Sequence, residues 1–100
     1  MLITDEINRL IKREFNVVAD EDVVKEAQEW TLAWKVSPQM IGLIYSYMKH
    51  KYEPGATLHD MERVLGVANE SISFALRELE AHGYLTISRA SKPFLYRVTK

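Results

Sequence analysis

The fold is decided by a stretch that begins Thr57-Leu58-His59-Asp60-Met61-Glu62-Arg63-Val64-Leu65-Gly66-Val67-Ala68 and continues to Thr99. Thr57, with Asp60 three residues later, predicts a helix start of the capping-box kind. Gly66 predicts the end of this helix, since glycine readily adopts the left-handed backbone that closes helices. Apolar residues recur between these points at helical spacing, and we expect them to face inward: Leu58, Met61, Val64 and Leu65.

A second helix is predicted from Asn69 to His82, with Gly83 closing it. At about 100° per residue, one face of this helix is apolar and is expected to be buried. That face consists of Ile72, Ala75, Leu76 and Leu79. The opposite face centres on Glu70, Phe74, Arg77 and Ala81, with Ser73 beside it.

Two strand-like runs follow, at residues 84–88 and 94–98. Apolar and polar side chains alternate along both, and the connection 89–93 contains Pro93, so the pattern predicts a β-hairpin with a loop at its tip. Leu85 and Ile87 alternate with polar neighbours in the first run. The expected fold class is α+β, mainly α with a small β-hairpin.

Upstream, Ser37 followed by Pro38 predicts the start of a helix that runs to about Lys51. Its apolar arc is wide, which indicates a central helix covered on two sides. One face carries Ile41, Ile44, Tyr45 and Met48, and a second carries Met40, Leu43 and Tyr47.

Two further amphipathic helices are expected at residues 3–15 and 21–35, each opened by acidic residues. Each has an apolar stripe that must be buried, against the central helix or a second subunit. We therefore expect a homodimer, with these dimerisation residues: Ile3, Ile7, Leu10, Ile11, Trp30 and Trp34.

The 100 residues, 47% apolar, are expected to form a single domain, with 1–36 as an N-terminal helical extension and 37–100 as the main unit. The absence of cysteine fits a reducing compartment. The sequence contains no apolar run of membrane-spanning length and no signal-peptide pattern at its start. We expect a cytoplasmic protein without membrane contact.

Charge is segregated along the chain although the net charge is only −1. Residues 1–37 have a balance of −3, whereas residues 83–100 carry four basic residues and no acid. The positive end therefore falls on the expected hairpin, which favours a directional binding face.

The run from Leu65 to Leu85 resembles the recognition-helix signature of winged helix-turn-helix regulators, including the MarR-like families. The matching residues include Leu65-Gly66-Val67, Ser71-Ile72-Ser73, Leu76 and Leu79-Glu80, and the resemblance extends over about residues 37–99. It implies a winged helix-turn-helix fold that binds double-stranded DNA, with helix 69–82 in the major groove and the wing at 88–94 on the backbone. A transcriptional regulator is the expected role.

The candidate DNA-binding residues combine that resemblance with side-chain chemistry. Serine hydroxyls can reach a phosphate or a base edge, arginine can bond a guanine or a phosphate, and further cations neutralise phosphates. On the helix these residues are Asn69, Ser71, Ser73, Phe74 and Arg77. On the wing and at the end of the central helix they are Arg89, Lys92, Lys49 and Lys51.

Three residues depart from the family pattern. Phe74 stands where the family usually has an arginine, Glu70 adds an acid to the same face, and Ala68 replaces a capping serine. Two other functions therefore stay open: a protein-interaction module that uses Phe74 and the tryptophan-bearing helices, and a domain of a plasmid or phage replication initiator. No catalytic, cofactor-binding or metal-ligating constellation is found, so no enzyme is expected.

Overall fold

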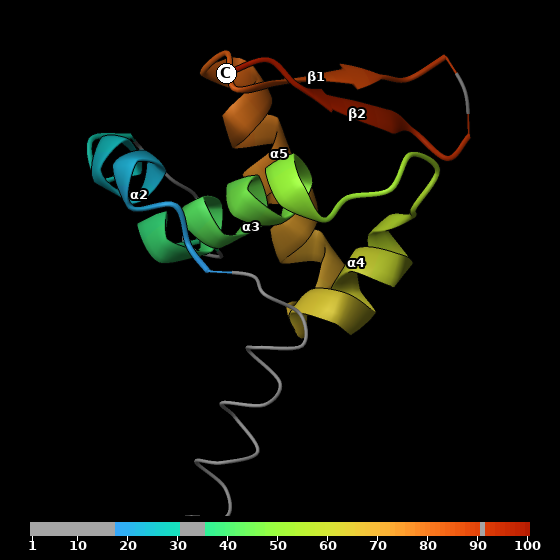
Figure 1. Ribbon diagram of the computed structural model, residues 1–100, viewed down its shortest axis with the longest axis horizontal. Helices are drawn as coiled ribbons and strands as arrows, with labels where there is room; N and C mark the ends of the chain where they lie inside the picture. The colour runs from blue at the N-terminus through green and yellow to red at the C-terminus, as the bar shows by residue number, and fades with distance from the viewer. Residues whose placement is uncertain (1–17, 31–35, 91) are drawn as a thin grey trace, which may run out of the picture.

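The computed structural model describes residues 18–30, 36–90 and 92–100. In these ranges the chain forms four helices and then an antiparallel hairpin, which confirms the expected mainly α class (Figure 1). The elements are α2 (Glu21–Ala27), α3 (Pro38–His50), α4 (Leu58–Leu65), α5 (Asn69–Ala81), β1 (Leu85–Ser88) and β2 (Leu95–Val98). The helix predicted at 3–15, with Ile3, Ile7, Leu10 and Ile11, lies outside the described residues, as does Trp34.

Helix α3 is central, as its wide apolar arc predicts. It lies between α2 on one side and α5 and β2 on the other (Figure 1). Ser37 caps its start by accepting from the backbone N–H of Met40 at 3.2 Å. Residues from both apolar faces are buried, namely Ile41, Ile44, Tyr45, Tyr47 and Met48, while Met40 and Leu43 are half-buried.

Helix α2 packs on α3 at a position without a side chain. The backbone N–H of Asp20, the N-cap of α2, donates to the carbonyl of Gly42 at 3.1 Å. A Cβ at Gly42 would overlap the side chain of Val24 and lie 2.9 Å from the carbonyl oxygen of Asp20. Val23 and Ala27 enter the core, so the described part of the N-terminal extension shares one core with the rest of the chain.

The prediction that this helix continues past Ala27 is wrong for residues 28–30, and residues 31–35 lie outside the description. The N–H groups of Glu29 and Trp30 donate to carbonyls only three residues earlier, at 3.0 and 3.1 Å, which tightens the chain into a turn. Trp30 packs against the core and stacks on His82, with ring centroids 3.7 Å apart and planes 2° from parallel.

The two ends of α4 and the C-terminal end of α5 follow the local signals in the sequence. Thr57 and Asp60 form the reciprocal capping box, with bonds of 3.1 and 2.9 Å. Gly66 ends α4 with φ of 67°, and Gly83 follows α5 with φ of 81°. The expected buried face of α5 is confirmed: Ile72, Ala75, Leu76 and Leu79 are each at most 1% exposed.

The hairpin pairs Leu85 with Val98 and Ser88 with Leu95. Both strands start one residue later than predicted, so Tyr84 and Phe94 lie outside them. Tyr84 is buried rather than alternating outward, and its ring meets Tyr45 edge-on at 5.4 Å.

The end of the described chain returns to α3 and α5. The Tyr45 hydroxyl donates to the carbonyl of Lys100, and the N–H of Thr99 donates to the carbonyl of Tyr84 at 2.9 Å. The Thr99 hydroxyl also donates to the carbonyl of Gly83 at 2.8 Å. These bonds attach the end of the hairpin to α3 and to the residues that follow α5.

Candidate nucleic-acid interface

The outward face of α5 carries the residues that the sequence singles out. Asn69 and Arg77 are exposed, whereas Ser71, Ser73 and Phe74 are half-buried. A 13-residue helix rises about 20 Å, so one face of α5 could follow a groove over several base pairs. The buried opposite face holds these side chains in a fixed orientation because it is packed against α3 and α4.

Phe74 is covered on two sides. It packs against the buried core, and the guanidinium carbon of Arg77 lies 4.7 Å from its ring centroid. An arginine over an aromatic face is stabilised electrostatically and keeps its charge. Phe74 thus acts as a support for Arg77, a role that residue spacing alone did not suggest.

Ser73, Arg77 and Arg89 line one crevice of about 300 Å³ between α5 and the hairpin. Its remaining walls are apolar or aromatic and come from α4, α5 and the hairpin: Leu58, Leu76, Ile87, Phe94 and Tyr96. The structure therefore brings two predicted cations and one predicted hydroxyl together from residues up to 16 positions apart in the sequence. A hydroxyl and a guanidinium group that line the same crevice are side chains that can bind an anionic oxygen of a phosphate.

Arg89 is held by a partner that the sequence reading missed. Its two terminal nitrogens donate to the two carboxylate oxygens of Glu80 at 3.0 and 2.9 Å. The hydrogen bond lowers the pKa of the Glu80 carboxyl and raises the pKa of the Arg89 guanidinium, so both groups stay charged at neutral pH. The pair joins α5 to the residue after β1. It orients the Arg89 guanidinium and neutralises part of its positive charge.

Lys92 lies beside the crevice. It lines an adjoining apolar groove of about 410 Å³ that shares three residues with the crevice: Leu58, Phe94 and Tyr96. Lys92 is exposed.

Lys49 and Lys51 are placed elsewhere. The Lys49 ammonium nitrogen lies 5.8 Å from the ring centroid of Tyr45, on α3. Lys51 lines a depression that also includes the acids Glu53 and Asp60. The structure thus does not bring these two lysines into the crevice with Arg77 and Arg89.

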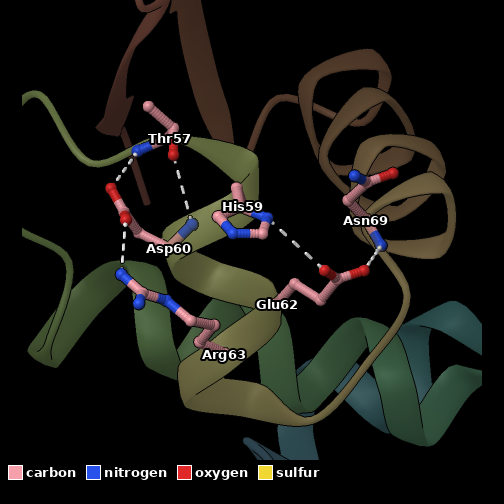
Figure 2. A network of polar contacts seen from close by, with 6 residues as sticks. All are labelled: Thr57, His59, Asp60, Glu62, Arg63 and Asn69. Carbon is pink, nitrogen blue, oxygen red and sulfur yellow. Dashed lines mark hydrogen bonds and ion pairs between the residues drawn. The ribbon is translucent and has the colours of Figure 1, made fainter.

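The start of α5 has a cap that local sequence does not provide. Ala68, the N-cap residue, has no side-chain acceptor, and the Glu62 carboxylate accepts from the N–H of Asn69 at 3.1 Å instead. The other oxygen of Glu62 lies 3.7 Å from Nδ1 of His59 (Figure 2). Alanine at the N-cap position cannot accept a hydrogen bond through its side chain. Ala68 therefore indicates that the acceptor must come from elsewhere in the chain.

Of the predicted dimerisation residues, the structure describes Trp30 alone. Its stack on His82, and its tilted contact with Tyr84 at 5.7 Å between centroids, lie within one chain. Among the described residues there is no group of three or more metal-ligating side chains and no helix with the length and apolar character to cross a membrane. No family model matches the chain, and a search of curated proteins finds no significant match.

Proposed function

We propose that this protein binds double-stranded DNA as a winged helix-turn-helix, with α5 in the major groove and the wing at residues 88–94 on the backbone. The observation that supports this most is the crevice in which Ser73, Arg77 and Arg89 converge from α5 and the hairpin. A helix, a three-residue turn, a second helix and a hairpin occur in the order that the proposal requires.

The cations have different roles in this proposal. Arg77 is exposed over Phe74 and can reach a phosphate or a guanine edge, while Lys92 meets the backbone. Arg89 already has a carboxylate partner, so it orders the wing and contributes less to the attraction of DNA. Binding should therefore depend on few charges and show a modest salt dependence.

A transcriptional regulator of this kind acts as a homodimer in our proposal, because two subunits place two recognition helices on half-sites about 34 Å apart. The proposal for the dimer rests on the apolar stripe of residues 3–15 in the sequence, because Val23 and Ala27 of α2 are buried in the chain's own core.

The test is a fluorescence-anisotropy titration of a labelled random-sequence duplex at low and physiological salt, with the mass in solution measured by light scattering. We expect binding at low salt that weakens as salt is added, and a mass of two chains. No measurable affinity for duplex DNA at low salt would falsify the proposed function.

A protein-interaction module on the same scaffold is the second candidate, and exposed apolar residues of the hairpin favour it. Phe94 and Leu95 are 38% and 41% exposed, and Phe94 lines the apolar groove beside α4. This alternative predicts salt-insensitive behaviour toward DNA and a protein complex that is lost with Leu95→Asp. Leu95 is a better probe than Phe74, because Phe74 packs against the core.

A further inference from the structure

The N-terminal end of α5 is capped by a carboxylate from another helix. Helices α2, α3 and α4 are capped by the side chains of their own N-cap residues, Asp20, Ser37 and Thr57. At α5 the acceptor is Glu62, seven residues before Asn69 and on the preceding helix (Figure 2). A full negative charge therefore occupies the end of the helix that would otherwise attract anions.

The N-terminal end of a helix combines backbone N–H groups with a partial positive charge, which makes it a natural phosphate site. The Glu62 carboxylate already accepts from the N–H of Asn69, and its side chain is 37% exposed, so water screens its charge only in part at this end of the helix. The start of α4 is closed in the same way by Asp60, which accepts from the N–H of Thr57 at 2.9 Å. That backbone bond holds the pKa of the Asp60 carboxyl below its usual value.

The cations of the interface lie away from this end. Arg77 is eight residues after Asn69, about 12 Å along the helix axis, which exceeds the screening length of about 8 Å at physiological salt. Arg89 is beyond it, bound to Glu80 near the end of α5. The N-terminal end of α5 thus presents negative charge to a nucleic acid, and the C-terminal part presents positive charge. The two charged regions act almost independently.

We propose that Glu62 determines which end of α5 the backbone of a bound duplex can approach. Its carboxylate excludes phosphate from the N-terminal end of α5 and directs the backbone of a bound duplex to the crevice of Ser73, Arg77 and Arg89. This inference rests on the DNA-binding function proposed above.

The test compares the wild-type chain with Glu62→Gln, which removes the charge and keeps an oxygen that can accept from Asn69. The readout is the anisotropy of a fluorescein-labelled random-sequence duplex over a salt series. We expect binding about two- to five-fold tighter, the size of a charge effect at a helix end. The log–log salt dependence should also steepen by about 0.9 if one further phosphate is taken up.

The matched control is Glu21→Gln, which removes one exposed carboxylate at the start of α2, on the other side of α3. It should leave affinity unchanged. If Glu62→Gln melts early in circular dichroism, the double variant Glu62→Gln with Ala68→Ser gives α5 a local serine cap and allows the same comparison.

The outcomes separate the two proposals. In one outcome the wild-type chain binds the duplex while Glu62→Gln binds it no more tightly than Glu21→Gln does. That result overturns the role of Glu62 and leaves the DNA-binding function standing. Binding by Glu62→Gln where the wild-type chain shows none overturns the proposed function and, with it, the role of Glu62 in a bound duplex. If none of the chains binds the duplex at low salt, the proposed function and the role of Glu62 both fail.

Discussion

The junction of α2 with α3 and the junction of α5 with the hairpin are built by different means. The first is a close backbone approach, in which Asp20 bonds the carbonyl of Gly42 and Val23 is buried beside it. The second combines buried apolar contacts with the exposed ion pair of Arg89 and Glu80 beside an open crevice. At Gly42 the first junction has no room for an added atom, whereas the second borders the crevice of Ser73, Arg77 and Arg89.

This difference separates the residues that hold the fold from those of the proposed interface. Close-packed sites lose stability when a single methyl group is added, since neighbours have nowhere to move. Exposed ion pairs contribute little to stability and can exchange partners, because water and salt screen them. Substitutions at the two junctions should therefore differ in both size and kind.

The largest effect is expected for Gly42→Ala. The added Cβ overlaps Val24, so overpacking of about 1–3 kcal/mol should exceed the gain of up to about 1 kcal/mol that alanine brings to a helix. Thermal unfolding followed by circular dichroism should show a lower Tm. Ser46→Ala, on the same helix, is the control and should change it little, and a Gly42→Ala protein as stable as wild type would refute the close approach.

A smaller effect is expected for His82→Ala, which removes the stack on Trp30 between the α2 segment and the end of α5. Stacked aromatic pairs contribute about 0.5–1.5 kcal/mol beyond their burial, so the free energy of unfolding should fall by about that amount. Tryptophan emission in a Trp34→Phe background, which isolates Trp30, should shift toward the red. The control, His50→Ala at the exposed end of α3, should change neither the free energy of unfolding nor the emission. Equal changes in the two variants would argue against the stack.

The smallest effect on stability is expected for Glu80→Gln. Because the folded-state pKa of Glu80 is lowered from 4.5, its contribution is present above that value and is lost as the pH falls through the lowered pKa. Denaturant unfolding should show a small deficit for the variant at neutral pH that disappears in acid. A deficit that persists or grows in acid would contradict the ion pair, and Glu21→Gln serves as the charge control.

The elements whose signals are local were predictable from the sequence. The caps at Ser37 and Thr57, the αL residue Gly66 and the buried stripe of α5 each depend on residues within a few positions of one another. The width of the apolar arc on α3 was sufficient to predict that it is central. The class of the fold followed from these.

The contacts that shape the candidate site were not predictable, because they join residues from different elements. Glu80 holds Arg89 across the end of α5, and Glu62 caps α5 from α4. The early end of α2 has the same origin: Trp30 stacks on a residue 52 positions away, which periodicity within residues 21–35 does not reveal. Lys49 and Lys51 share the sign of the wing cations, yet they lie apart from the crevice.

The position of Lys49 and Lys51 outside the crevice provides the most direct test of the proposed interface, because it distinguishes the geometry of the crevice from positive charge alone. The measurement is the salt dependence of affinity for a labelled random-sequence duplex, comparing Arg77→Ala/Lys92→Ala with Lys49→Ala/Lys51→Ala, which removes the same charge. We expect the first pair to flatten the log–log slope by about 1.8, or two phosphate contacts, and the second to leave it near wild type. Equal losses in the two double variants would contradict an interface centred on α5 and the hairpin.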